Sequence, residues 1–431
     1  MESQSSMKAK NDKKDIAKLS VLTFLILLFL ALLGSGCKED DCPMQLVQYS
    51  EPVFAPMEEV RVTAAYEQAR EIENPGKIYY KDGYVFINEV DKGIHVIDNR
   101  NLSHPVAVGF VNLPGNKDLA ARGDYMYADN YMDLVVLDIS NKNKIVESGR
   151  VQDVFDAYYH YYEDLGVLID YQLREEEVQL DCGQDVIFDD VIWFGRAENG
   201  LIAYSQDNSG GATTGIGGSL ARFTITDDYL YTINDWRMKL FDITDLKNPT
   251  EGNTVELGWG IETIFPYQDK LFLGARNGMH IYDNSNPNLP EYISTYSHIN
   301  TCDPVVVQGD YAYVTLRSGN ECDNFTNQLD VINIKDVHNP FLVKTYPMQN
   351  PHGLGINGTC LFIAEGDYGL KVFNASDVSR IGENLMAHHE GIHALDVIPL
   401  DDVLFMIGND GLYQYQYDCG NQFQYLSTIY F

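Results

Sequence analysis

The sequence predicts an all-β protein that is built from repeated units of about four short strands. Two observations predict this class: a strand motif recurs at a nearly constant interval after residue 75, and no segment there has the 3.6-residue apolar periodicity of a helix. The composition agrees, because 29 Tyr and 19 Phe among 431 residues favour strands. Hydrophobic residues make up 45% of the chain, which is enough for a large core.

The first recurring strand consists of Gly or Asp, usually a Tyr, an apolar residue and an aromatic residue. Its aromatic position is occupied by Phe86, Tyr127, Tyr231, Phe272, Tyr313, Phe362 and Phe405. Most neighbouring copies lie 41 to 49 residues apart. The gap of 104 residues between Tyr127 and Tyr231 leaves room for one degenerate copy at 163–169 and for an insertion near 183–219.

A second apolar strand follows most copies of the first and ends in Asp or Asn. Its copies are Ile94–Asp98, Leu134–Asp138, Met238–Asp242, Met279–Asp283 and Asp330–Asn333. In four of the copies a proline follows seven residues later. We expect the Asp or Asn side chain to cap the turn that leaves the strand, and the proline to set up the next extended segment.

A unit of this size cannot bury both of its faces alone, and radial stacking of such units into a β-propeller solves the problem. Leu134–Asp138 and its counterparts resemble the LVIVD repeat family, which comprises bacterial and archaeal proteins of propeller type. The resemblance covers 76–431. It implies a single propeller of about eight four-stranded blades, or of seven if 156–219 is wholly an insertion, and it supplies no catalytic residue. Residues 43–75 would add an outer strand or a lid.

The N-terminal segment, residues 1–36, has the features of an export signal. Five lysines precede the 13-residue apolar run Val21–Leu33, which is too short to span a membrane, and Gly34-Ser35-Gly36-Cys37 follows. The segment resembles a bacterial lipoprotein signal, which implies cleavage before Cys37 and lipidation of that cysteine. The usual large aliphatic residue three places before the cysteine is replaced by Gly34, so an ordinary signal peptide or an N-terminal anchor is the alternative. We expect residues 37–75 to form a lipidated tether and lead-in.

The residues directly after Cys37 concern the location of the protein. Lys38-Glu39-Asp40-Asp41 resembles the export signal of Gram-negative lipoproteins that are displayed on the outer face of the outer membrane. The sequence therefore predicts a surface-exposed outer-membrane lipoprotein. The alternative is a solvated tether on a protein that faces the periplasm.

The charge balance excludes one class of partner. The chain has 30 Lys and Arg against 63 Asp and Glu, a net charge of −33, so it repels phosphate backbones and nucleic-acid binding is excluded. The same acidity gives no attraction to anionic headgroups, so we expect membrane attachment through the lipid alone.

Six cysteines besides Cys37 lie in a chain whose export permits disulfides. Cys302 opens the first strand of its unit and Cys322 lies in the loop between the second and third strands. Those two points share one face of a blade, so we predict a Cys302–Cys322 disulfide. Cys360 lies inside an apolar strand and is predicted to be a free buried thiol. The pairing of Cys42, Cys182 and Cys419 stays open.

A column of polar residues marks the start of the first strand in successive units, where a propeller has its channel mouth. It contains Glu262, Asp303, His352 and His393, with Asp118 and Arg222 nearby. Carboxylates and imidazoles that converge on one axis can hold a divalent cation or a small polar ligand. Solvated channel residues without a ligand are the alternative.

No catalytic motif accompanies these residues. The sequence has no Gly-x-Ser-x-Gly elbow and no His-Glu-x-x-His zinc motif, and the glycine run at 209–218 lacks the Gly-Lys-Ser/Thr ending of a phosphate loop. The leading hypothesis is a non-enzymatic binding module for a protein or glycan partner. The alternatives are a metal-assisted extracellular hydrolase or lyase with its site at the channel mouth, and a scaffold in a lipoprotein complex.

Overall fold

The strands of the described residues form eight sheets. The computed structural model describes residues 44–155, 161–162, 164–179, 214, 216–219, 221–297, 304–317, 327–419 and 422–431. Seven sheets each hold four consecutive strands of one repeat, and the eighth has three strands. The chain divides into two compact units, residues 1–51 with 171–192 and residues 52–170 with 193–431. The seven repeat sheets, called blades here, all belong to the larger unit.

The first three blades follow one another along the chain, with the insertion between the second and the third. Blade 1 holds β3 (Pro75–Lys81), β4 (Tyr84–Glu89), β5 (Gly93–Asp98) and β6 (Val106–Asn112). Blade 2 holds β7 (Leu119–Arg122), β8 (Tyr125–Asn130), β9 (Asp133–Asp138) and β10 (Val146–Val151). Blade 3 holds β14 (Phe223–Thr226), β15 (Tyr229–Ile233), β16 (Arg237–Asp242) and β17 (Thr250–Glu256).

The remaining four blades are consecutive and reach the end of the chain. Blade 4 holds β18 (Ile261–Tyr267), β19 (Lys270–Ala275), β20 (Gly278–Asp283) and β21 (Glu291–Ser297). Blade 5 holds β22 (Val305–Gln308), β23 (Tyr311–Leu316), β24 (Gln328–Asn333) and β25 (Phe341–Pro347). Blade 6 holds β26 (Leu354–Asn357), β27 (Cys360–Ala364), β28 (Leu370–Asn374), the short 3-10 helix η1 (Ile381–Glu383) and β29 (Leu385–His389). Blade 7 holds β30 (Asp396–Pro399), β31 (Val403–Ile407), β32 (Gly411–Tyr417) and β33 (Phe423–Tyr430).

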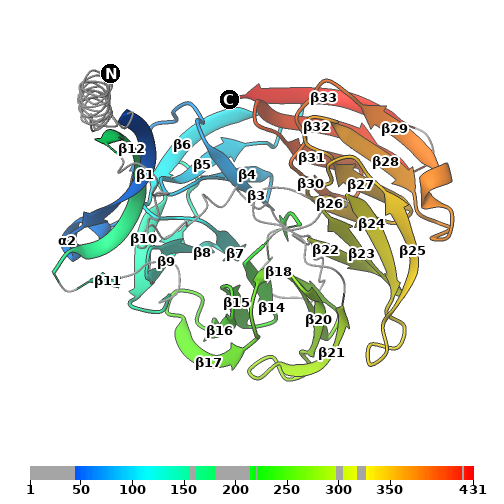
Figure 1. The fold of residues 1–431 in the computed structure, drawn as a ribbon, viewed down its shortest axis with the longest axis horizontal. Coiled ribbons are helices and arrows are strands. Elements are labelled where there is room, and N and C mark those ends of the chain that lie inside the picture. Colours follow the sequence, from blue (N-terminus) through cyan, green and yellow to red (C-terminus); the bar gives the residue numbers. More distant parts are fainter. Residues whose placement is uncertain are drawn as a thin grey trace, which may run out of the picture. The chain divides into compact units, whose positions relative to one another are not determined.

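The blades of the larger unit surround one axis, with the first strand of each blade innermost (Figure 1). Blade 7 closes the ring against blade 1. The buried amides of Asn99 and Gln414 exchange two hydrogen bonds across this interface, with N···O distances of 3.0 and 2.7 Å. The Ser427 hydroxyl donates to the Leu102 carbonyl at 2.6 Å. The predicted propeller is confirmed, and seven blades, the count that the sequence left open, form its ring.

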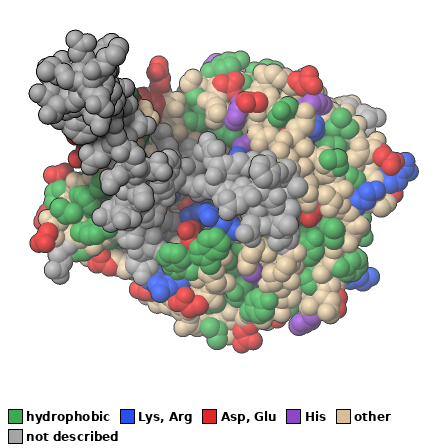
Figure 2. All heavy atoms as spheres, in the orientation of Figure 1, with side chains coloured by type: hydrophobic (Ala, Val, Ile, Leu, Met, Phe, Trp, Pro, Cys, Tyr) green, Lys and Arg blue, Asp and Glu red, His purple; other side chains and the backbone are tan. Residues whose placement is uncertain are grey.

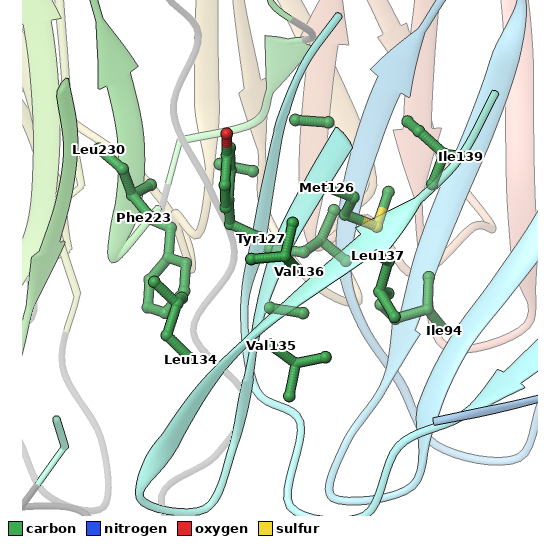
Figure 3. Close-up of a cluster of buried hydrophobic side chains, with 14 of the residues drawn as sticks. Ile94, Met126, Tyr127, Leu134, Val135, Val136, Leu137, Ile139, Phe223 and Leu230 are labelled. Carbon is green, nitrogen blue, oxygen red and sulfur yellow. The ribbon is translucent and has the colours of Figure 1, made fainter. Parts of the chain in front are cut away.

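The repeated apolar strand is buried on both of its faces. Figure 3 shows Leu134 and Val136 of β9 on the side of blade 3, next to Phe223, whereas Leu137 lies beside Ile94 of blade 1. Successive side chains of a strand point to opposite faces, so a run without polar residues fills two blade interfaces at once. This geometry explains why the strand reads as a continuous apolar run.

The Asp that ends this strand caps the following turn, as the sequence predicts. Asp138 Oδ1 accepts hydrogen bonds from the Ser140 backbone N–H at 2.9 Å and from the Ser140 hydroxyl at 2.6 Å. These bonds favour the ionised carboxylate and lower the pKa of Asp138. Asp283 repeats the arrangement with Ser285.

The lead-in segment adds a strand to the rim of blade 1. After the short helix α2 (Met57–Val60), β2 (Ala65–Glu67) pairs antiparallel with the outermost strand β6. The Tyr66 hydroxyl donates to the carbonyls of Val108 and Lys142, at 3.1 and 2.9 Å, so it ties blade 1 to blade 2. Of the two roles that the sequence left open for this segment, the outer strand is the one observed.

The eighth sheet has the strand order β1 (Met44–Ala55), β12 (Gly166–Gln179) and β11 (Tyr161–Tyr162). It includes 166–169, which the sequence assigned to a degenerate blade strand. This segment pairs with β11, through Tyr161 opposite Val167, rather than with strands of a blade. Within the smaller unit, Arg174 Nε donates to Glu51 Oε2 at 2.6 Å. Among the described residues, no helix is long and apolar enough to cross a membrane.

Only the end of the insertion falls within the described residues. There β13 (Ile216–Gly217) pairs with the inner edge of β3, with Ile216 opposite Tyr80. The segment therefore lies along the innermost strand of blade 1. Residues 183–213 of the insertion lie outside the described residues.

One disulfide corrects the sequence-based assignment of the cysteines. Cys360, which was predicted to be a free thiol, is bonded to Cys419. Cys360 lies in β27 of blade 6 and Cys419 follows β32 of blade 7, so the bond joins neighbouring blades. Sequence position alone hides this pairing, because the two cysteines are 59 residues apart. Cys37, Cys302 and Cys322 lie outside the described residues, so their lipidation and pairing stay predictions.

Replacing Cys360 and Cys419 together by alanine is expected to lower the free energy of unfolding by about 2 to 4 kcal/mol, because the bond restricts the unfolded chain. Urea unfolding of the two proteins under oxidising conditions measures the loss. The matched measurement repeats the unfolding under reducing conditions, where the Cys360–Cys419 bond is absent from both proteins and the difference should shrink. Equal stability of the Cys360→Ala/Cys419→Ala variant and the unchanged chain would contradict the expectation.

Candidate functional site

The candidate site lies at the end of the propeller where the first strand of each blade begins. Because neighbouring strands are antiparallel, the turn from the second to the third strand of each blade returns to this same end. We call it the channel mouth. Five predicted site residues lie there: Asp118 directly before β7, Arg222 directly before β14, Glu262 at the start of β18, His352 just before β26 and His393 just before β30. Asp303 lies outside the described residues.

Two of the predicted residues, His352 and His393, are brought together. They come from neighbouring blades, and their ring centroids are 6.3 Å apart. His352 is anchored through its backbone, whose N–H donates to the Ala364 carbonyl at 2.7 Å and whose carbonyl accepts from the Thr315 hydroxyl at 2.8 Å. Burial, followed by the positive charge of Arg317, lowers the pKa of His352 to about 3. The imidazole of His352 is therefore neutral at physiological pH.

A glycine turn makes room for His352. Gly366 has φ of +53°, and a Cβ at this position would lie 2.9 Å from His352 Nε2 and 2.7 Å from Asn350 Nδ2. The Asn350 amide nitrogen lies 3.2 Å from His352 Nε2 and is placed to donate to it. The turn between β27 and β28 thus sets the position of the imidazole.

The two ring nitrogens of His393 have different surroundings. Its Nε2 lies 3.6 Å from Asp367 Oδ1 and 3.5 Å from Asn409 Nδ2. Its buried Nδ1 has no hydrogen-bond partner in the part of the chain that the structure describes.

The predicted metal site is not tested as a whole, because Asp303 lies outside the described residues. Within the ranges that the structure describes, no group of three or more His, Cys, Asp or Glu side chains could hold a metal ion. Glu262 pairs with Arg276, whose Nε donates to Glu262 Oε1 at 3.1 Å. A metal ligand set of Glu262, Asp303, His352 and His393 stays a prediction.

The structure reveals two exposed tryptophans at the channel mouth that the sequence analysis missed. Trp236 lies between β15 and β16 with 41% of its surface exposed, and Trp259 lies between β17 and β18 with 59% exposed. The guanidinium carbon of Arg276 lies 5.3 Å from the ring centroid of Trp259. We call Trp236, Trp259 and Arg276 the tryptophan platform. A signal was present, because Gly258 and Gly260 flank Trp259 and predict an exposed loop.

Comparison with known protein families identifies the repeat in three segments of the chain. A family model described as the LVIVD repeat matches residues 76–112, 116–153 and 300–347, which correspond to blades 1, 2 and 5. The chain carries LVIVD repeats. No curated protein matches it.

Three solved structures are similar to this chain. A protein from Lactobacillus plantarum is 10% identical with a TM-score of 0.52, and the match covers 82% of this chain and 96% of that one. BamB from Moraxella catarrhalis is 11% identical with a TM-score of 0.47, and the match covers 87% of this chain and 98% of that one. The designed protein Ika8 is 9% identical with a TM-score of 0.49, with coverage of 84% and 89%. At these identities the likeness concerns the fold alone.

Near the axis of the LVIVD propeller, Asp118 has a structural role. Its Oδ2 accepts from the Lys77 ammonium group at 2.7 Å and from the backbone N–H groups of Arg222 and Phe223, at 2.7 and 3.0 Å. Its Oδ1 accepts from the Leu119 N–H at 2.7 Å. One buried carboxylate thus joins blades 1, 2 and 3. Arg222 contributes its backbone to this junction, and its side chain lies 3.9 Å from Asp235.

A second buried carboxylate, Asp396, holds the end of the insertion. The Ser219 hydroxyl lies 2.9 Å from Asp396 Oδ1, and the Leu354 N–H donates to that hydroxyl at 2.9 Å. Because Asp396 is fully buried, its pKa rises to about 8, although hydrogen bonds from Val397 and Ser219 and the charge of Lys77 act in the opposite direction. Asp396 is therefore protonated at neutral pH in the folded protein.

This raised pKa predicts a pH dependence of stability. In the unfolded chain an aspartate has a pKa near 4, so between about pH 4 and 8 the folded state holds a proton that the unfolded state has lost. The contribution of Asp396 to the free energy of unfolding is complete below about pH 4 and falls by about 1.4 kcal/mol per pH unit up to about pH 8. Urea unfolding at pH 5 and pH 7.5 measures the fall.

Asp396→Asn is the matched variant, because an amide resembles the protonated carboxyl and does not titrate. The free energy of unfolding of the unchanged chain should fall between pH 5 and pH 7.5 relative to that of the variant, so the variant gains a growing advantage as the pH rises. The pKa of Asp129 is also raised, to about 6, but Asp129 is present in both proteins and cancels in the comparison. A difference that does not change with pH would contradict the expectation.

Proposed function

We propose that the chain is a non-enzymatic, lipid-anchored binding module that captures an extracellular partner, protein or glycan, with its channel mouth. The observation that carries this proposal is the exposure of Trp236 and Trp259 at one end of the propeller, with Arg276 beside Trp259. Tryptophan and arginine are the residue types that most often dominate binding energy at interfaces. An exposed indole has no value for the solubility of a lone protein, so two of them at one end indicate contact with a partner.

The state of the histidines supports binding rather than catalysis. A general base works best with a pKa near the working pH, whereas the pKa of His352 is lowered to about 3. The imidazole of His352 can accept or donate hydrogen bonds in its neutral form. Together with the Asn350 amide, it offers polar contacts that fix the orientation of a ligand.

The anchor and the location form the second part of the proposal. Cleavage before Cys37 and its acylation would attach the propeller to the outer membrane, and Lys38–Asp41 would direct it to the cell surface. Radiolabelled palmitate should enter the unchanged chain but not Cys37→Ser. Protease added to intact cells should remove the propeller, whereas a protein that faces the periplasm should be cleaved only after the outer membrane is opened.

The binding test compares three forms of the protein on the cells that make it. Chemical cross-linking followed by purification should recover the same partner with the unchanged chain and with Phe341→Ala. Phe341 is a matched control because 57% of its surface is exposed and it begins the outermost strand β25 at the opposite end of the propeller. The partner should be lost with the double variant Trp236→Ala/Trp259→Ala. Equal recovery with all three forms would contradict a role for the channel mouth.

A further inference from the structure

The tryptophan platform is built from two loops that are fixed to each other. The Leu257 N–H donates to the Trp236 carbonyl at 2.7 Å, and the Ile261 N–H donates to the Asp235 carbonyl at 3.0 Å. These bonds lie on either side of Trp259, so the β15–β16 turn and the β17–β18 connection form one structural piece. Both indoles are therefore carried on a backbone that is ordered before any ligand arrives.

The two indoles stand outside the core that lies beneath them. Leu257, Ile261 and Met238, which neighbour them in the sequence, are buried in the cluster between blades 3 and 4. Trp236 and Trp259 are 41% and 59% exposed and belong to none of the buried clusters of the described residues. In these loops the smaller apolar side chains are therefore buried in the core, whereas the two indoles are exposed to solvent.

Two arginines of these loops and strands, Arg276 and Arg237, are each paired with a carboxylate. Arg276 lies over the Trp259 ring and donates to Glu262. Next to Trp236 in the sequence, Arg237 Nε donates to Glu256 Oε1 at 2.9 Å. Such pairs hold guanidinium and carboxylate groups in fixed planes, where they can exchange further hydrogen bonds with a ligand that offers both donors and acceptors.

These features match the chemistry of a sugar ring. A pyranose has a flat face of C–H groups, which packs on the electron-rich face of an indole, and a rim of hydroxyl groups that donate and accept hydrogen bonds. Each unit of a glycan chain offers such a face and such a rim, so one chain can contact more than one aromatic side chain. A peptide combines an apolar face with several hydrogen-bonding groups only where particular side chains occur together.

The charge of the protein selects among glycans. The chain has a net charge of −33, and the arginines at the tryptophan platform are paired with carboxylates. On the face drawn in Figure 2, acidic, basic and hydrophobic side chains are interspersed. A polymer of sugar acids would therefore be repelled by the molecule as a whole without meeting a concentrated positive field.

From these observations we infer that the tryptophan platform is a stacking site for a neutral glycan chain. The inference rests on the proposed function, since it names the class of partner that the channel mouth takes. Trp236 and Trp259 would stack on sugar rings, and Arg276 and Glu262 would bond the hydroxyl groups of the ring on Trp259. His352 and His393 are not required for this contact.

The experiment uses intrinsic tryptophan fluorescence and calorimetry with five defined probes. The neutral probes are cellohexaose, xylohexaose, maltohexaose and mannohexaose, and the acidic probe is hexagalacturonate. We expect at least one neutral hexasaccharide to bind, and Trp259→Ala and Trp236→Ala each to weaken that binding by about tenfold or more. Phe341→Ala should bind as the unchanged chain does. Trp259→Phe, which keeps an aromatic face, should recover part of the loss.

Three outcomes would overturn the inference: binding of none of the neutral probes, binding that the tryptophan variants leave unchanged, and binding of hexagalacturonate alone. Thermal unfolding of each variant shows whether it is folded. Because both indoles are exposed, we expect little change in the unfolding midpoint. The same variants distinguish a failure of the glycan inference from a failure of the proposed function. If no sugar binds but a cross-linked protein partner is lost with the tryptophan variants, the glycan inference is wrong and the binding module stands.

Discussion

Asp118→Ala is expected to lower the free energy of unfolding by about 3 to 5 kcal/mol, the cost of removing one partner from a buried ion pair. The Lys77 ammonium group, 2.7 Å from Asp118, would be left in a buried site without its closest counter-charge. The backbone N–H groups of Leu119, Arg222 and Phe223 would lose their acceptor at the same time. Urea unfolding at pH 7 measures the loss.

Two companion variants show that the buried junction, rather than the loss of an acid, causes the effect. Asp228 pairs with Arg122 at 2.9 Å but is 55% exposed, so Asp228→Ala should cost less than about 1 kcal/mol. Adding Lys77→Met to Asp118→Ala should restore part of the stability, because the isolated charge is then gone. A loss below about 1 kcal/mol for Asp118→Ala would show that solvent or another group replaces its carboxylate.

The repeat could be predicted from the sequence because its causes are local. The Asp138 side chain bonds Ser140 two residues later, and Leu134–Leu137 alternate between two blade faces within a single strand. Each effect acts over a few residues and recurs in other blades, so the pattern survives in the sequence. The approach of His352 to His393 was also predictable, since both occupy the same place in neighbouring repeats.

What the sequence hid depends on contacts between distant segments. The role of Asp118 needs the backbone at Arg222, which follows the insertion, to return beside blade 2. The Cys360–Cys419 bond needs the second strand of blade 6 to lie beside the end of the third strand of blade 7. The local sequence around Asp118 does not distinguish it from a solvated aspartate, and that around Cys360 does not distinguish it from a free buried thiol. Only the three-dimensional ring distinguishes these roles.

Phe405→Ala is expected to lower the free energy of unfolding by about 3 to 5 kcal/mol, because it opens a cavity where blade 7 meets blade 1. Phe405 is fully buried in β31, and its ring centroid lies 5.3 Å from that of Tyr80 in β3. It belongs to a cluster that joins residues near the two ends of the propeller sequence, among them Ile78 and Ile407. Chemical unfolding of the variant and the unchanged chain measures the loss.

The size of this loss tests ring closure, because none of the described strands is shared between the first and last blades. In an open arc Phe405 would lie on the exposed face of a terminal blade, and its truncation would cost within about 0.5 kcal/mol, as is expected for the exposed Phe341. In a closed ring it should cost as much as Phe272→Ala, which empties the equivalent position in blade 4. Equal losses for Phe405→Ala and Phe272→Ala would mean that the side chains of the closing interface are packed as tightly as those of an interior one. A small loss for Phe405→Ala beside a large one for Phe272→Ala would contradict the closed ring.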